Sequence, residues 1–91
     1  MDDLEVNLAR GDRAKILLED ELLNEMLKKI EDDCINQIRT SKMVETEVRE
    51  KAYSLMTAIE LLKRNLRSVY DTGKMAEAQL VRRGRPPKNR I

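Results

Sequence analysis

The residues that supply most catalytic and redox chemistry are absent or rare in this chain of 91 residues. It contains no histidine, so most metal sites and acid–base catalysis near neutral pH lack their usual residue. The single cysteine, Cys34, cannot form an intramolecular disulfide, which suits a reducing compartment. The sequence also has no Gly-rich phosphate-binding loop and no Ser-His-Asp set. We therefore expect a non-enzymatic protein with no catalytic residues, metal ligands or cofactor.

Strand-forming and large aromatic residues are also scarce. There is no Trp and no Phe, and Tyr53 and Tyr70 are the aromatic residues. Leu, Glu, Arg and Lys are the commonest residues, and these four and Ala favour helices. No apolar run exceeds three residues, which argues against a transmembrane segment, and the acidic start of the chain argues against a secretory signal. The composition predicts a single small all-α domain without membrane contact.

Helix-breaking residues are confined to a few positions. The three glycines are Gly11, Gly73 and Gly84, and both prolines follow Gly84, so residues 12–72 contain neither residue. This spacing predicts an N-terminal segment over residues 1–11, a helical domain over 12–80 and a tail over 81–91. Asp12 is the expected N-cap of the first helix.

Two apolar seams divide the helical domain. The first runs to about Arg39 and recurs at steps of three, four or seven residues. Its members are Ile16, Leu23, Leu27, Ile30, Cys34 and Ile38. The second seam steps by four and three over three heptads. Its members are Val48, Ala52, Leu55, Ile59, Leu62, Leu66 and Val69.

The segment between the seams predicts a turn. Extending the second seam backwards would bury Glu45, Ser41 and Glu31, which is costly without partners. We therefore expect a turn over residues 39–45, capped by Thr40, Ser41 or Thr46, and an antiparallel hairpin of two long helices. One continuous helix in a longer coiled coil is the alternative, because Cys34 and Ile38 fall on the extended seam.

The first helix has an apolar stripe wider than one neighbour can cover. Leu18, Leu22 and Met26 widen it, and two helices bury one seam rather than a two-sided core. We expect these three residues to mediate self-association, with two hairpins forming a four-helix bundle. The alternatives are packing under residues 2–10 or 74–80, and docking on a larger partner.

Acidic runs and the cysteine are the remaining candidates for chemistry in the body. Consecutive residues of a helix point in different directions, so the runs over residues 19–21 and 31–33 predict a solvated acidic surface rather than a metal site. Cys34 lies on the apolar stripe, and there is no histidine to activate it. We therefore expect a buried, unreactive thiol.

Charge is distributed unevenly along the chain. Residues 82–91 carry five basic residues and no acidic one, whereas residues 1–81 carry 13 basic and 17 acidic residues, giving 13 − 17 = −4. The basic residues of the tail are Arg82, Arg83, Arg85, Lys88 and Arg90. An acidic body with a basic tail predicts that any nucleic acid is bound by the tail.

The tail resembles an AT-hook, a short DNA-binding motif centred on Arg-Gly-Arg-Pro. The core is Arg83-Gly84-Arg85-Pro86, although Arg82 replaces a Pro before it and Pro87 stands where a basic residue often follows. Gly84 lets the backbone approach a narrow groove, and the flanking arginines suit the negative potential of AT-rich minor grooves. Pro86 and Pro87 keep the chain extended, so that Lys88 and Arg90 reach phosphates. The resemblance implies binding of AT-rich duplex by a disordered tail. A solubilising tail, or one that binds protein or RNA, is the alternative.

Parts of the body resemble small helical proteins of tailed phages and prophages. The segments are ARGDRA (9–14), LLED (17–20) and TGKMAEAQL (72–80). The resemblance implies a bacterial cytoplasmic or virion protein that contacts phage DNA or a phage structural protein. Two function classes follow: a DNA-binding module on a dimeric helical platform, and an assembly factor that acts through protein contacts of the hairpin.

Overall fold

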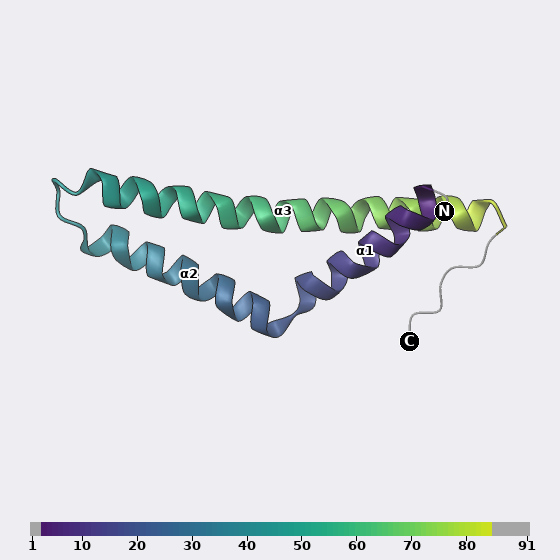
Figure 1. Cartoon of the computed structure of the whole chain (residues 1–91), viewed down its shortest axis with the longest axis horizontal. Coiled ribbons are helices and arrows are strands. Elements are labelled where there is room, and N and C mark those ends of the chain that lie inside the picture. Colours follow the sequence, from purple (N-terminus) through teal and green to yellow (C-terminus); the bar gives the residue numbers. More distant parts are fainter. Residues whose placement is uncertain (1–2, 85–91) are drawn as a thin grey trace. The chain divides into compact units, whose positions relative to one another are not determined.

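Three helices make up the described part of the chain, residues 3–84 of this computed structural model (Figure 1). They are α1 (Asp3–Glu19), α2 (Glu21–Thr40) and α3 (Thr46–Arg82), and residues 3–84 contain no strand. The predicted all-α class is confirmed, but the expected first arm consists of two helices rather than one. The chain forms two compact units: unit 1 comprises Met1–Leu18 and Asn65–Ile91, and unit 2 comprises Glu19–Arg64. Each unit is described by itself below.

The start of α1 corrects the predicted N-terminal segment. The helix begins at Asp3, and it continues without interruption through Gly11 and Asp12. Asp12 is therefore not an N-cap, and Gly11 does not separate a segment from the domain. A glycine inside a helix costs about 1 kcal/mol relative to alanine, so its presence calls for a tertiary reason.

That reason is a contact between two glycines in unit 1. A Cβ atom built on Gly11 would lie 2.8 Å from the Cα of Gly73, and one built on Gly73 would lie 2.7 Å from the Cα of Gly11. Both glycines are buried inside helices, α1 and α3 respectively. The absence of both side chains thus allows the two backbones to touch. Gly73, like Gly11, marks a helix contact and not a boundary.

Small and medium apolar residues surround this contact. The core of unit 1 consists of Leu8 and Ala14 from α1 and of Ala76 and Leu80 from α3, each at most 6% exposed. The small residues next to the glycines let the helices remain close over about two turns. Because α1 and α3 run antiparallel (Figure 1), Leu8 and Leu80 lie at the same end of the contact, toward the start of α1. The α3 seam therefore continues past Val69, where the predicted seam ended.

The break between α1 and α2 was not predicted. Asp20 has extended backbone angles (φ −69°, ψ 117°), and its carboxylate accepts a hydrogen bond of 2.7 Å from the backbone N–H of Leu23. This is the geometry of an N-cap, which satisfies one of the free N–H groups at the start of α2. In the sequence, Asp20 is hidden within an acidic run that we interpreted as a solvated surface.

The predicted turn is confirmed, although it spans residues 41–45 rather than 39–45. α2 ends at Thr40 and α3 begins at Thr46. The hydroxyls of Thr40 and Ser41 do not cap α3, however. They donate to the carbonyls of Asn36 (2.8 Å) and Ile38 (2.9 Å), and so satisfy acceptors at the end of α2. The continuous helix considered as the alternative is wrong.

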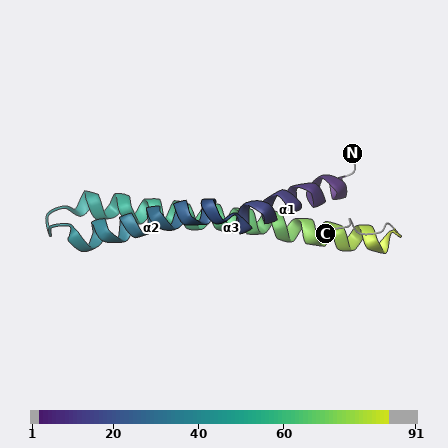
Figure 2. The ribbon, with the colours of Figure 1, turned by 90° about the horizontal axis from the view of Figure 1, so that it is seen from below.

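One arginine connects this turn to α3. The guanidinium of Arg49 donates to the hydroxyl of Ser41 (3.1 Å) and to the carbonyls of Lys42 (2.8 Å) and Met43 (3.1 Å). Within the turn, the carboxylate of Glu45 accepts from the N–H of Lys42 at 2.8 Å. These bonds hold residues 41–45 against the first turn of α3, where two views show α2 and α3 side by side (Figures 1 and 2).

The core of unit 2 is small. The buried apolar side chains are Leu27 and Cys34 from α2 and Ala52 and Ile59 from α3, each at most 8% exposed. The predicted burial of Cys34 is confirmed, and its lack of reactivity stays a prediction. Ile16, which we placed on the same stripe, belongs to unit 1 and is 67% exposed, so its assignment to the seam is wrong.

Candidate functional site

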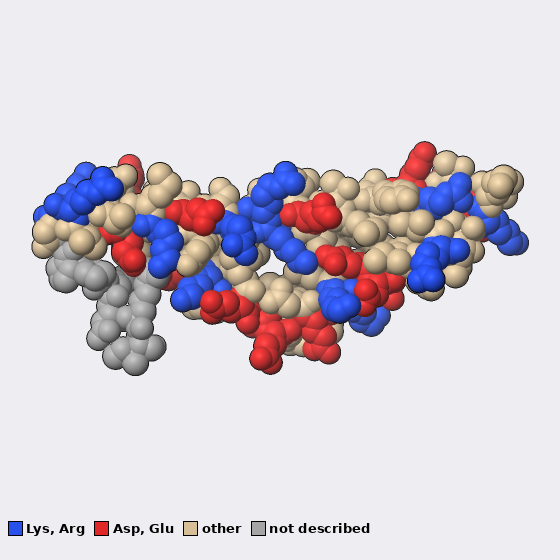
Figure 3. Space-filling view, turned by 180° about the vertical axis from the view of Figure 1, so that it is seen from behind, with Lys and Arg blue, Asp and Glu red and all other residues tan. Residues whose placement is uncertain are grey.

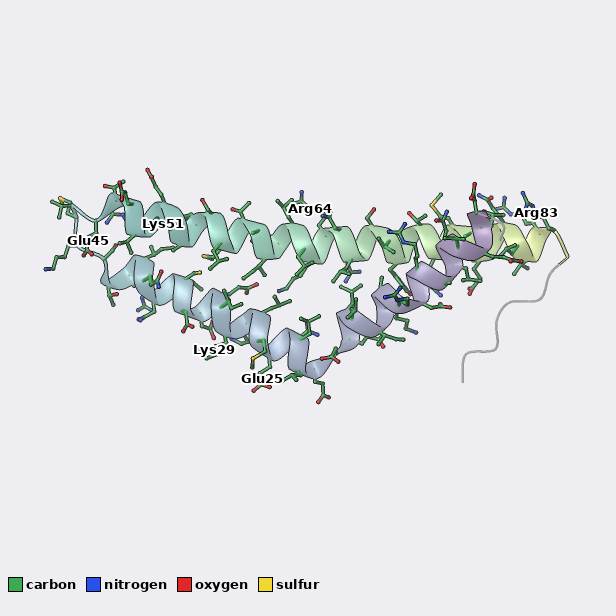
Figure 4. All side chains as sticks on the ribbon, viewed as in Figure 1. Glu25, Lys29, Glu45, Lys51, Arg64 and Arg83 are labelled. Atoms are coloured by element: carbon green, nitrogen blue, oxygen red, sulfur yellow. The ribbon has the colours of Figure 1, made fainter. Side chains whose placement is uncertain are left out.

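The basic tail predicted to bind DNA, residues 82–91, begins at the C-terminal end of α3 and is called the Arg-rich segment below. Arg82 is the last residue of the helix, and Arg83 and Gly84 form a turn after it; all three are exposed. The N–H of Arg83 donates to the carbonyls of Gln79 (3.1 Å) and Leu80 (3.2 Å), which extends the helical bonding by one residue. Figure 4 labels Arg83 at this end of α3. The other predicted DNA-binding residues lie outside the described residues; they are Arg85, Pro86, Lys88 and Arg90.

Gly84 has a local role in ending the helix. Its φ of +83° lies in the left-handed region, which side chains other than glycine rarely adopt, and its N–H donates to the carbonyl of Val81 at 3.0 Å. Glycine is the preferred residue at this position after a helix. Gly84 therefore has a structural explanation besides a close approach to DNA. The case for DNA recognition consequently depends on the arginines and not on the glycine.

The three residues predicted to mediate self-association are divided between the two units. Leu22 and Met26, on α2 in unit 2, are 64% and 42% exposed, as an interaction surface requires. Leu18 is half-buried and belongs to unit 1.

An ion pair in unit 2 identifies which sides of its helices lie together. The ammonium of Lys63 lies 3.0 Å from a carboxylate oxygen of Glu31. On α2, one residue corresponds to a rotation of about 100°. Measured from buried Cys34, Glu31 therefore lies on one flank of the helix, and Ile30 and Met26 lie on the other.

The same argument applies to α3. Measured from buried Ile59, Lys63 lies on one flank and Leu55 and Leu62 lie on the other. The flanks of Glu31 and Lys63 are on the same side of the hairpin, because these residues contact each other. The opposite side therefore collects four apolar side chains that are 37–47% exposed. We call this side the apolar face; it comprises Met26, Ile30, Leu55 and Leu62.

Two residues of the apolar face were predicted to be buried between the two helices. Leu55 and Leu62 were predicted to lie in the seam between the two helices, but they are 47% and 44% exposed, whereas Ala52 and Ile59 are buried. In this hairpin, α2 covers the row of Ala52 and Ile59 and leaves the row of Leu55 and Leu62 partly exposed. The steps of four and three in the sequence place these residues in two adjacent rows. They do not indicate which of the two rows α2 covers.

Charged side chains surround this core. Glu25 lies on the side of α2 away from α3, and Arg64 lies on the side of α3 away from α2 (Figure 4). Lys28 pairs with Asp32 and Lys29 with Asp33, both at 3.2 Å and both solvent-exposed, which confirms the solvated acidic surface predicted for these aspartates. On the face seen in Figure 3, Lys and Arg lie next to Asp and Glu along most of its length. Among the described residues seen there, acidic side chains therefore interrupt the basic ones that a nucleic acid would contact.

Metal-ligating clusters and surface hollows are the remaining candidate sites for small molecules. Among residues 3–84, no group of three or more Cys, Asp or Glu side chains is placed to hold a metal ion. A surface hollow in unit 1 is lined by Asn7, Arg10, Ser68, Val69 and Thr72 and measures about 80 Å³. This volume is below the several hundred Å³ typical of a ligand pocket. A second, open hollow of about 430 Å³ lies on the surface of α2, and its lining is Met26 and the charged residues Glu25, Lys28, Lys29, Asp32 and Asp33. Within the same residues, no helix combines the length and the apolar character needed to cross a membrane.

The resemblances suggested by sequence segments stay predictions. Comparison of the chain with models of known protein families, with curated proteins and with solved structures finds no match.

Proposed function

We propose that this chain is a small non-enzymatic DNA-binding protein that contacts the minor groove of AT-rich duplex through residues 82–91. The observation that carries the proposal is the concentration of charge: five basic residues and no acidic residue within ten positions, on a body with a net charge of −4. Because the body repels phosphates overall, favourable contacts with DNA are restricted to this segment.

The order of residues in the segment supports minor-groove contact. Arg83 and Arg85 flank Gly84, and Pro86 and Pro87 prevent a helix from continuing after them. Arginines in a narrow groove gain from its enhanced negative potential, which is strongest in AT-rich duplex. Lys88 and Arg90 are then available for phosphates, which carry no sequence information. The resemblance to phage proteins makes phage DNA the first candidate.

Fluorescence anisotropy with labelled AT-rich and GC-rich duplexes tests this proposal. The comparison is between the full chain and a variant ending at Gly84, which retains α3 and the bonds that end it. We expect the full chain to prefer AT-rich duplex and the shortened chain to lose most of its affinity for both. Equal binding by the two proteins would refute the proposal.

Two point variants separate groove contact from charge alone. Arg85→Ala should weaken binding to AT-rich duplex more than binding to GC-rich duplex, because it removes a groove contact. Lys88→Ala removes the same charge and should weaken both equally. If the two variants behave alike, the segment acts as a nonspecific polycation.

An assembly factor acting through protein contacts is the second candidate function. The apolar face of unit 2 favours it, because Met26, Ile30, Leu55 and Leu62 expose apolar surface on one side of a hairpin with a small core. A chain that does not bind DNA but binds a different protein through this face would support this candidate.

A further inference from the structure

The apolar face is large relative to the core that it adjoins. Unit 2 buries four apolar side chains between its helices, and the apolar face exposes four more, each larger than Ala52. A helical hairpin of this size has little apolar burial to offset its conformational entropy. Covering the face would about double the number of apolar side chains in its core.

We propose that the apolar face binds the same face of a second copy of this chain, so that two copies of unit 2 form an antiparallel four-helix bundle. The proposal is independent of DNA binding, because it uses no residue of the Arg-rich segment. It adds Ile30, Leu55 and Leu62 to the residues expected to mediate self-association, and it retains Met26 among them.

A self-complementary arrangement of charge favours a second copy as the occupant. Lys29 and Asp33 lie one turn apart on the edge of α2 that borders the apolar face. If α2 of one copy runs antiparallel to α2 of the other about Glu31, Lys29 of each copy faces Asp33 of the other. A twofold axis therefore brings the basic residue of each copy opposite the acidic residue of the other, so the edge is complementary to itself.

The same charges select between two arrangements of the bundle. With the 41–45 turns at opposite ends, α2 packs on α2 and the Lys29–Asp33 pairs form between copies. With both turns at one end, α2 packs on α3 and Lys29 lies level with Asn65, where it has no acidic partner. Charge complementarity therefore favours turns at opposite ends.

Neighbouring apolar residues on other sides of unit 2 provide matched controls. Leu61 is 45% exposed, close to the 44% of Leu62, but lies about 100° away on α3. Ile35 is 41% exposed, close to the 37% of Ile30, and lies on the opposite flank of α2. The double variants Ile30→Gln/Leu62→Gln and Ile35→Gln/Leu61→Gln therefore replace equally exposed side chains, and differ in whether these lie on the apolar face.

Sedimentation equilibrium of the full chain measures the association directly. We expect the wild type to dimerise, Ile30→Gln/Leu62→Gln to weaken dimerisation by at least about 100-fold, and the control variant to change it by less than about threefold. A wild type that stays monomeric at about 1 mM would overturn the proposal and leave the face to a different protein. Equal loss in both variants would also overturn it. Circular dichroism at the same concentrations checks that the variants remain helical. If only Ile30→Gln/Leu62→Gln loses helix on dilution, folding is coupled to association through the apolar face, which supports the proposal.

Charge exchange tests the contact between copies. Lys29→Asp and Asp33→Lys each place like charges opposite each other in a dimer of identical copies. A mixture of the two variants pairs two acidic residues with two basic ones. We expect the mixed dimer to be about tenfold tighter than either identical dimer. No preference for the mixed dimer would contradict the opposed-turn arrangement.

Discussion

The contact between Gly11 and Gly73 makes an unusual prediction: adding a methyl group to either glycine should destabilise a helix that would otherwise gain from it. In an exposed helix, replacing glycine with alanine stabilises by about 1 kcal/mol. In Gly73→Ala, however, the new Cβ would lie 2.7 Å from the Cα of Gly11 and 3.0 Å from the carbonyl oxygen of Asn7. Ordinary contact begins at 3.4 Å, so the helices must separate by about 3.4 − 2.7 = 0.7 Å.

The magnitude follows from what that separation removes. A gap of 0.5–1 Å forfeits about a quarter to a half of the dispersion energy of the atoms facing it, and overpacking a well-packed contact costs about 1–3 kcal/mol. The facing atom is backbone and cannot rotate away, so we take the upper part of that range. After subtracting about 1 kcal/mol for helix propensity, Gly73→Ala should destabilise unit 1 by about 1–2 kcal/mol. Gly11→Ala should behave similarly, since its Cβ would lie 2.8 Å from Gly73.

Urea denaturation followed by circular dichroism measures this change, at one fixed protein concentration because association adds to stability. Hydrogen exchange of the α1 amides locates it, and we expect faster exchange there in both variants. Ala78→Gly, at an exposed position of α3, measures helix propensity in the same helix and should cost about 1 kcal/mol. If Gly73→Ala stabilises the chain by as much as Ala78→Gly destabilises it, the two backbones do not touch.

Four further predictions concern other parts of the chain. Asp20→Ala should destabilise by about 1 kcal/mol in urea denaturation because α2 loses its N-cap, whereas Asp20→Asn should retain most of the stability. Ile59→Ala should cost about 2–5 kcal/mol under conditions where the chain is monomeric. Leu62→Ala should cost clearly less there, and equal costs would contradict its exposure. Cys34, 3% exposed, should react with an alkylating reagent only as fast as unit 2 opens, and rapid labelling of the native chain would refute its burial. If residues 82–91 neutralise five phosphates, the logarithm of the DNA affinity should fall with the logarithm of the salt concentration at a slope of about −4 to −5, and a slope near zero would exclude phosphate contact.

Local sequence patterns predicted the parts of the fold that depend on neighbouring residues. The helical class, the 41–45 turn and the burial of Cys34 and Ile59 follow from periodicity and from the cost of burying polar groups. The contact between Gly11 and Gly73 joins residues far apart in the chain, so each glycine was interpreted as a boundary. Tertiary contact outweighed propensity at both positions.

Other features were present in the sequence but ambiguous. Asp20 is a good N-cap residue, yet its acidic neighbours on both sides concealed the cap. The second seam was predicted to lie between the two helices, while the row that α2 covers depends on how the two helices face each other. That facing direction is established by Glu31 and Lys63, on separate helices, and a single sequence does not reveal such a pairing.

The pairing of Glu31 with Lys63 has a consequence for how α2 and α3 align along their length. Apolar seams repeat every seven residues, so leucines and isoleucines alone would tolerate a slip of one heptad. In one direction such a slip would place Lys63 opposite Ile38, and in the other it would place Glu31 opposite Met56. Either slip leaves a half-buried charge without its counterpart, which destabilises the misaligned hairpin. The ion pair thus selects one alignment of α2 and α3, even though it adds little net stability to that alignment. Replacing both residues with apolar ones should therefore give a hairpin that is equally stable but no longer unique in its register.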